Sequence, residues 1–539
     1  MNHPFIHHPF IYIYNYNVQR KLTVAEHFLP RSKVKTPEGD IVPDVATPEQ
    51  SQKKRDVQFV LQPIWFLLAV AALVGVLLLP IESLAWEGQV ALAVLAFAIV
   101  LWVTEAVSYP VSAFLIISLI AVLLGLSTDP ETGDIVGTSS ALGTGLQGFS
   151  TSALALVAAA LLLAGAMQAT GLHERLALWV MKLAGDKTSN ILIGAIVIAT
   201  LLAFFVPSAT ARAGAVVPIL LGMVAAFGLS TNSKMASLLV ITAVQAVSIW
   251  NVGIQTAAAQ NFVALNFIQD EFGQTISWGQ WFIWAAPWSV LMSIALFFIM
   301  RASIKPEADS ISGGRELIEQ KLEELGPMSG REKRLVAVAV LLLFVWATGD
   351  ILHPVSAPVA TVIAVSYMLL PKVGVFDWKT AQDLVSWGTL IVFAVGISLG
   401  TFLLDTGAAS WLSEQTFGAM GLDSMPLLAT IALVSLFNIL IHLGFASATS
   451  LASALIPVFI ALSTTIAAGD ASIGFVVIQQ FVICFGFLLP VSAPQNMLAY
   501  GTGAFTRGEF LKTGIPLTIV AYLLVLLFSA TYWDWMGLI

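Results

Sequence analysis

Long apolar runs recur from Pro63 to the end of the chain, and they constrain its fold more than any other feature. A helix needs about 20 apolar residues to cross the hydrocarbon core of a bilayer, and runs near this length return throughout. The 539 residues are 58% hydrophobic and only 10% charged, which is unlike a soluble globular protein. The weaker alternating segments of a β-barrel do not appear in the sequence. The sequence therefore predicts an all-α polytopic membrane protein, which we place in the inner (plasma) membrane of the cell.

Two of the runs, 190–228 and 426–468, have awkward lengths for simple spanning helices. We interpret each as a hairpin that enters and leaves on one side, and every other run as a single crossing. Two runs contain polar, Gly- or Pro-containing stretches at 250–261 and 489–496. Irregular backbone at membrane depth is tolerated only where it lines a cavity. The prediction is about 11 transmembrane helices, two re-entrant hairpins and two interrupted helices.

The placement of basic residues supports this topology. Of the 24 Lys and Arg residues, all except Arg212 fall in segments that this topology assigns to the cytosol, and the opposite loops contain acidic but no basic residues. Positive charge concentrates in cytosolic loops of membrane proteins. The N-terminus is therefore predicted in the cytosol and the C-terminus outside.

An internal repeat relates the two halves of the chain. Four landmarks recur in the same order and at a nearly constant offset: Ser208-Ala209-Thr210 and Ser447-Ala448-Thr449, Pro218 and Pro457, Thr170-Gly171 and Thr406-Gly407, and Gln260-Asn261 and Gln495-Asn496. The charge pattern places the roots of the first hairpin inside and those of the second outside, so the repeats are predicted to be inverted. Inverted repeats with interrupted helices are typical of secondary transporters, whose site lies near the midplane.

The chain divides accordingly. The predicted parts are a cytosolic N-terminal tail, 1–62; a first repeat, 63–300; an amphipathic cytosolic linker, 301–334; and a second repeat, 335–539. In the tail, His3, His7 and His8 have metal-binding side chains, but compositional bias is the favoured explanation for them.

The sequence resembles the divalent anion/sodium symporter family of di- and tricarboxylate carriers over about residues 63–535. The resemblance is in the paired Ser-x-Thr tips, the segment "WVTEAVSYPVSA" at 102–113 and the Pro-rich second interruption. It implies an elevator mechanism, a homodimer formed through a scaffold domain, and a substrate held between the two tips. Under this resemblance the scaffold helices are 63–126 and 335–372, and the transport elements are 150–300 and 383–539.

The candidate substrate-binding residues come from the two tips and the two interruptions. A helix that restarts after a break presents unpaired N–H groups and a partial positive charge, and Ser and Thr add hydroxyl donors. The alternative is that these hydroxyls only cap their helices. The candidates are Ser208, Ala209, Thr210 and Arg212 in the first hairpin, His442, Ser447, Ala448 and Thr449 in the second, and Gln255, Thr256, Ser492 and Ala493 in the interruptions.

Two positions depart from the sodium-coupled members that the sequence resembles. Those members have Ser-Asn-Thr at each tip, whereas this chain has Ala209 and Ala448 in the middle. Each replacement removes an amide oxygen, and a hard cation such as sodium needs oxygen ligands. We therefore expect no cofactor and no metal site, and sodium coupling is disfavoured.

Arg212 needs a partner, because a guanidinium within the membrane costs at least about 3 kcal/mol on insertion scales. Neither hairpin contains Asp or Glu, so the candidate partners are a bound carboxylate and the backbone carbonyls of the adjacent break. His442 is either a site residue or a neutral core histidine. A fixed cation in place of sodium predicts obligatory exchange of dicarboxylates such as malate, succinate or 2-oxoglutarate.

Other functions remain as alternatives. Sodium- or proton-coupled symport of di- or tricarboxylates, with His442 as proton carrier, is one, and transport of sulfate is another. An enzyme is not expected, because the sequence contains no HExxH motif and no paired membrane aspartates. The expected partners are dicarboxylate anions, the lipid bilayer and a second copy of the chain; no nucleic acid is expected, since the basic residues are scattered.

Overall fold

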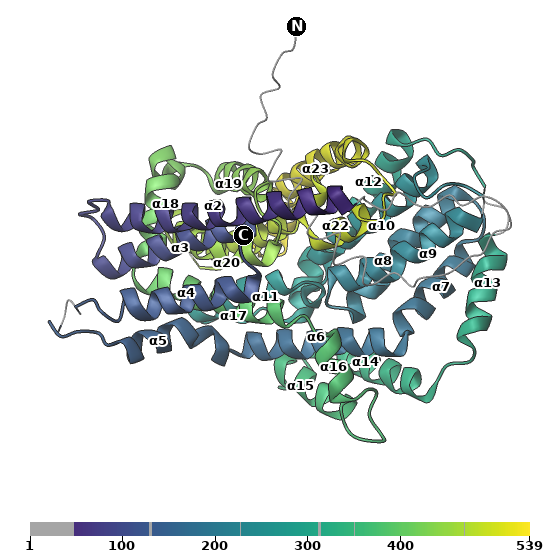
Figure 1. Cartoon of the computed structure of the whole chain (residues 1–539), viewed down its shortest axis with the longest axis horizontal. Coiled ribbons are helices and arrows are strands. Elements are labelled where there is room, and N and C mark those ends of the chain that lie inside the picture. The colour runs from purple at the N-terminus through teal and green to yellow at the C-terminus, as the bar shows by residue number, and fades with distance from the viewer. Residues whose placement is uncertain (1–47, 129–131, 227, 311–313, 350, 468) are drawn as a thin grey trace, which may run out of the picture.

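The computed structural model describes residues 48–539 except 129–131, 227, 311–313, 350 and 468, with side chains from Gln62 onward (Figure 1). Every element named in this part is a helix, which confirms the all-α prediction. The three histidines of the N-terminal tail lie outside the described residues.

The first helix, α2 (Pro48–Leu78), begins inside the segment predicted as tail, and Pro63 lies within it rather than at its start. Pro48 occupies the first turn, where a missing N–H costs nothing. The helix therefore starts several turns before the apolar run does, because helix formation does not require apolar residues.

The order of elements from α3 to α12 recurs from α14 to α23. The first series is α3 (Trp86–Thr104), α4 (Tyr109–Leu123), α5 (Thr138–Leu146), η1 (Gln147–Ser150), α6 (Ser152–Thr170), α7 (Leu172–Ala184), α8 (Thr188–Phe205), α9 (Ala209–Ala226), α10 (Lys234–Gly253), η2 (Gln255–Ala257), α11 (Ala259–Phe272) and α12 (Trp278–Ser303). The second is α14 (Gly330–Thr348), α15 (Ala357–Met368), α16 (Trp378–Leu384), α17 (Trp387–Asp405), α18 (Ala408–Thr416), α19 (Leu427–His442), α20 (Ala448–Ile466), α21 (Asp470–Ile483), η5 (Pro490–Ser492), α22 (Pro494–Tyr500) and α23 (Arg507–Ser529). Short helices α24 (Tyr532–Trp535), η3 (Gly418–Met420) and η4 (Leu422–Ser424) complete the described set, together with α13 (Gly314–Leu325) between the series.

Side chains repeat along with the helices. The indole Nε1 of Trp102 donates to Ser112 Oγ at 3.2 Å between α3 and α4, and that of Trp346 donates to Thr361 Oγ1 at 3.2 Å between α14 and α15. Gly171 and Gly407 start α7 and α18 with φ of 72° and 69°, a left-handed conformation that favours glycine. The recurring Thr-Gly landmark thus marks the same sharp turn in each half.

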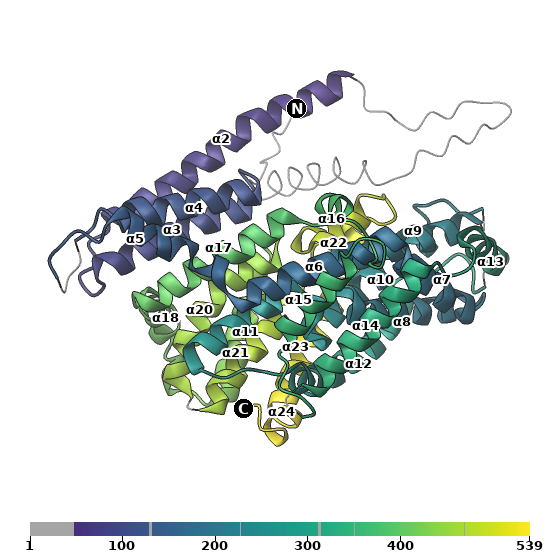
Figure 2. The same cartoon turned by 90° about the horizontal axis from the view of Figure 1, so that it is seen from below.

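The two series interlock at their interrupted helices. In two perpendicular views α7 and α13 lie at one end of the molecule and α18 at the other (Figures 1 and 2). The second arm of the first hairpin, α9, packs on α22, and the second arm of the second hairpin, α20, packs on α11. Each hairpin therefore reaches the interrupted helix of the other repeat.

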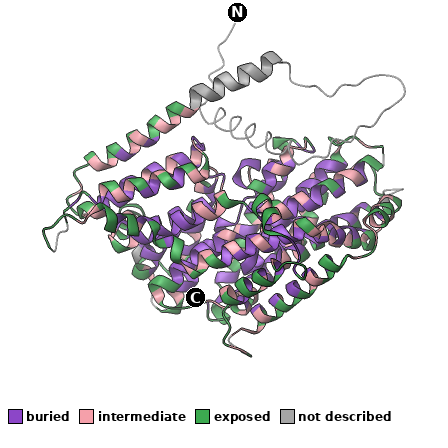
Figure 3. Cartoon of the chain, turned by 60° about the horizontal axis from the view of Figure 1, so that its bottom comes forward, coloured by how far each residue is buried: buried purple, intermediate pink, exposed green. Residues whose placement is uncertain are grey.

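Membrane-length helices confirm a multi-pass protein. Nine helices in the described part are long and apolar enough to cross a bilayer: α3, α6, α8, α9, α10, α12, α17, α20 and the stretch Arg507–Trp535. Burial differs among them: every residue of α10 after Lys234 is buried, whereas only 33% of the apolar window of α12 is buried. Buried residues lie mainly in the interior of the helical bundle and exposed ones on its outer helices (Figure 3). α10 is buried because it packs between α8, α9 and α12.

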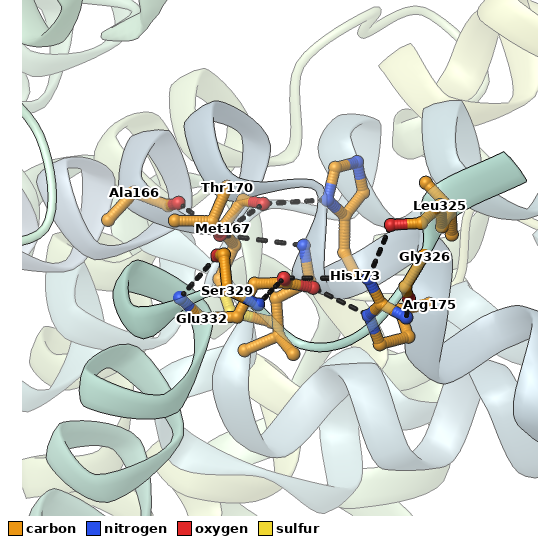
Figure 4. Close-up of polar contacts among 10 residues, drawn as sticks. Ala166, Met167, Thr170, His173, Arg175, Leu325, Gly326, Ser329 and Glu332 are labelled. Carbon is orange, nitrogen blue, oxygen red and sulfur yellow. Dashed lines mark hydrogen bonds and ion pairs between the residues drawn. The ribbon is translucent and has the colours of Figure 1, made fainter. Parts of the chain in front are cut away.

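The linker between the repeats packs against helices of the first repeat. Helix α13 packs on α7 and α9, with Ile318 buried and Leu317 near Gly222 of α9. Arg175 of α7 donates from Nε to Glu332 Oε1 at 2.6 Å and from Nη1 to the Gly326 carbonyl at 2.8 Å (Figure 4). We call this group the Arg175 clamp; it joins α7 to the start of α14.

The second repeat has an equivalent contact. Trp411 of α18 follows Gly407 at the same distance along the chain as Arg175 follows Gly171, so the two side chains occupy matching positions of the repeat. The Trp411 indole Nε1 donates to Ser83 Oγ at 2.9 Å, in the loop before α3. Each of these helices is thus tied to the loop that precedes the first helix of the opposite series.

Candidate functional site

Both hairpin tips are built in the same way. In the first, α8 ends at Phe205 and Val206, which precedes a proline, is extended with φ −121° and ψ 95°. Ser208 Oγ then accepts a hydrogen bond from the Ala211 N–H at 3.3 Å, and in the second hairpin Ser447 Oγ accepts from the Ser450 N–H at 3.3 Å. The recurring serines are therefore helix caps. Because they accept these bonds, their own O–H groups remain donors.

The tips are more accessible than their surroundings. Ser208 and Ala209 are half-buried and Thr210 is exposed. At the second tip Ser447 and Ala448 are half-buried, and Thr449 is buried at 9% exposure. At the first tip the accessible surface continues into the first turn of α9, where helical N–H groups lack intrahelical partners, whereas at the second tip Thr449 and Ser450 of α20 are already buried.

The interruptions are each held by an asparagine. Asn261 Nδ2 donates to the Asn251 carbonyl at 2.9 Å, and Asn496 Nδ2 donates to the Gly486 carbonyl at 2.7 Å. Both bonds reach back ten residues across the break. An amide side chain thus satisfies a carbonyl that the helix no longer serves, which accounts for the recurring Gln-Asn landmark.

Glutamines join the two interruptions to each other. Gln480 Nε2 donates to Asn261 Oδ1 at 3.1 Å, and Gln495 Nε2 donates to Ser248 Oγ at 2.9 Å. Gln260 Nε2 lies 3.6 Å from Cys484 Sγ. A buried polar network of this kind fixes the relative position of the two repeats at their centre.

Arg212 is fully buried, and half of its guanidinium is bonded to the first interruption. Its Nη2 donates to Asn251 Oδ1 and, at 3.0 Å, to the Ala257 carbonyl. Its Nε and Nη1 have no hydrogen-bond partner in the described part of the chain. None of the ion pairs between described residues includes Arg212. The guanidinium is thus anchored to the break and still has unpaired donors.

His442 makes the corresponding contact in the second repeat. Its Nε2 lies 3.2 Å from the Ser492 carbonyl, and its Nδ1 has no partner among the described residues. Ala257 precedes the first Gln-Asn landmark by the same interval as Ser492 precedes the second. Each hairpin therefore places one nitrogen-bearing side chain on the same carbonyl position of its own interruption.

The remaining candidates are held by neighbouring structure. Gln255 Nε2 donates to the Ile276 carbonyl at 3.0 Å, and Thr256 Oγ1 accepts from Trp278 Nε1 at 3.3 Å. Ser492 and Ala493 are buried, and Val491 beside them packs with Ala446 of the second tip. The structure thus places the second tip against η5, and the first hairpin contacts η2 through Arg212.

The polar network of this region also contains residues that were not among the predicted site residues: Ser248, Asn251, Gln260, Asn261, Gln480, Cys484, Gln495 and Asn496. The two Gln-Asn pairs are repeat landmarks in the sequence. Gln480 could have been found from the repeat as well, because Gln245 precedes it by the same number of residues as the first Gln-Asn pair precedes the second. The bond between Arg212 and Asn251 joins separate helices and has no signature in the sequence.

Comparisons with known proteins identify the family of this chain. Residues 62–539 match the model of the sodium:sulfate symporter transmembrane region. A "Membrane protein" of Cupriavidus necator is 49% identical over 473 residues, covering 87% of this chain and 92% of that one. A sodium-dependent dicarboxylate transporter, SdcS, of Staphylococcus saprophyticus is 26% identical, covering 87% of this chain and 90% of its own. The YdaH transporter of Alcanivorax borkumensis shares the fold, with a TM-score of 0.54, 15% identity, and coverage of 78% of this chain and 97% of that one.

Proposed function

We propose that this chain, which belongs to the sodium:sulfate symporter family of divalent anion/sodium symporters, exchanges dicarboxylates across the membrane without sodium. The substrate class is malate, succinate, 2-oxoglutarate or a similar dianion. The proposal places the substrate between the two hairpin tips, with the interruptions behind it. In this proposal the protein is a homodimer that works by an elevator movement. Its N-terminus is cytosolic and its C-terminus is external.

The observation that supports this function is the state of Arg212. It is a permanent cation with 0% exposure, it has no carboxylate partner in the described chain, and two of its nitrogens are unpaired. A buried charge is tolerated when it is paired and hydrogen-bonded. A carboxylate of the substrate supplies both the missing charge and acceptors for the unpaired donors.

Exchange follows from the permanence of that charge. Sodium leaves a coupled carrier together with its substrate, whereas a guanidinium cannot leave. An empty carrier would then have to move an uncompensated cation through the membrane interior, which is costly. A loaded carrier moves a compensated site, so each direction of movement requires a dicarboxylate.

Proteoliposomes test exchange directly. We expect uptake of labelled succinate into vesicles preloaded with succinate in sodium-free buffer, and at least about tenfold slower uptake into empty vesicles, because a barrier difference of about 1.4 kcal/mol already gives that factor. Vesicles without protein are the control. Equal uptake into empty vesicles under an inward sodium gradient would show that the protein is a sodium symporter.

Sodium-coupled symport is the second candidate, and the comparisons are what favour it. The family model is described as a sodium:sulfate symporter, and SdcS is a sodium-dependent dicarboxylate transporter. Against it stand Ala209 and Ala448, each of which has no side-chain oxygen. The family name suggests sulfate as the substrate and SdcS suggests a dicarboxylate. Measuring sulfate uptake in the same vesicles distinguishes these two substrates.

A further inference from the structure

We infer that His442 selects substrates that donate a hydrogen bond, so that the preferred dicarboxylate has a hydroxyl group beside one carboxylate. This inference rests on the proposed dicarboxylate function and adds to it a preference within that class. It follows from which atoms of Arg212 and His442 are bonded and which are free.

The backbone fixes the tautomer of His442. A carbonyl oxygen only accepts hydrogen bonds, so the 3.2 Å contact between His442 Nε2 and the Ser492 carbonyl requires the proton on Nε2. In the neutral ring the other nitrogen, Nδ1, then has a lone pair and no hydrogen.

That lone pair is buried and unsatisfied. His442 is 2% exposed, and Nδ1 has no partner in the described part of the chain. A buried acceptor without a donor costs about 1–3 kcal/mol. A carboxylate oxygen cannot satisfy it, because both atoms are acceptors; a hydroxyl group can.

Arg212 and His442 therefore offer different chemistry to a substrate held between the two tips. Arg212 offers N–H donors, which suit a carboxylate, and His442 offers an acceptor, which suits an O–H donor. Both side chains contact matched carbonyls of their interruptions, Ala257 and Ser492. A 2-hydroxy dicarboxylate satisfies both ends, whereas an unsubstituted one leaves Nδ1 unpaired.

Binding of three ligands to the purified full-length protein tests this inference. The ligands are (S)-malate, succinate and 2-fluorosuccinate, in which fluorine has nearly the size of a hydroxyl but cannot donate. We expect malate to bind about 3- to 10-fold more tightly than the other two, the range for one net hydrogen bond. Equal affinity for malate and 2-fluorosuccinate would overturn the inference, since size or a bound water would then suffice.

Two variants assign the preference to the ring. In His442→Gln the amide nitrogen replaces Nε2 and no group replaces Nδ1, so malate and succinate should bind within about twofold of each other. His353→Gln, in the loop before α15, is the matched control and should keep the native ratio. Retention of the malate preference in His442→Gln would overturn the inference. If none of the dicarboxylates binds native protein, the proposed function itself fails, which is a distinct result.

Discussion

Replacing Arg212 with methionine should weaken dicarboxylate binding strongly without destabilising the empty protein. The side chain is fully buried and no described carboxylate neutralises it, so in the absence of substrate it is a cost rather than a gain. Methionine has similar length and no charge. We expect the melting temperature of the empty variant to equal or exceed that of native protein, and succinate affinity to fall by about 2–5 kcal/mol, or roughly 30-fold or more.

The measurement is the melting temperature of detergent-purified protein with increasing succinate, because a ligand that binds only the folded state raises it as the ligand concentration increases. Arg334→Met is the matched control: Arg334 donates from Nε to the Gly374 carbonyl at 3.1 Å and lies outside the site. It should keep the succinate-dependent increase. A large fall in the melting temperature of empty Arg212→Met, with normal succinate binding, would show that Arg212 is structural.

Loss of Arg175 should destabilise the protein strongly. Arg175 and Glu332 have side-chain exposures of 6% and 5%, and Arg175 also serves the carbonyls of Leu325 and Gly326. Removing one member of a buried pair leaves the other uncompensated, at about 3–5 kcal/mol. Arg175→Met should therefore lower the melting temperature, whereas Arg175→Met with Glu332→Gln should recover part of the loss.

Lys182→Met provides the comparison for that prediction. Lys182 contacts Glu319 of α13 at 3.1 Å with side-chain exposures of 43% and 40%, and such exposed pairs contribute little. Equal effects of Lys182→Met and Arg175→Met would contradict the assignment of the clamp.

The clamp should also respond to acid. Burial by itself raises the pKa of Glu332, but hydrogen bonds from Arg175 and Ser329 outweigh burial and hold that pKa below its usual value. Because the folded-state pKa is the lower one, the stabilisation is present above the unfolded-state value and is lost as the pH falls through the folded-state value. Thermal melting of native protein and Arg175→Met across acidic pH checks this, since the difference between them should shrink as Glu332 is protonated.

The sequence predicted those parts of the fold that depend on a local pattern of residues. Apolar run length predicted the membrane helices, since hydrocarbon thickness sets that length. The Thr-Gly landmark predicted equivalent positions in the two repeats but not the turns, in which Gly171 and Gly407 have the left-handed backbone that favours glycine. The amphipathic spacing within 301–334 similarly predicted α13.

Short helices and contacts between distant residues could not be predicted from the sequence. The helices α5 and α16 lie in stretches that are polar enough to look like loops, and tertiary packing rather than composition makes them helical. The contacts of Arg212 and His442 with the interruptions join residues 45 and 50 positions apart. Spacing within one helix can be inferred from a sequence, whereas such contacts depend on how separate helices pack.

A cryo-electron microscopy map of the protein with succinate in sodium-free buffer tests the central claim most directly. We predict density for one succinate between the two hairpin tips, with a carboxylate within hydrogen-bond distance of Arg212 Nε or Nη1 and near the Ser208 and Ser447 hydroxyls. Density away from both tips, or an occupied site in which Arg212 bonds only to Asn251 and the Ala257 carbonyl, would contradict the claim.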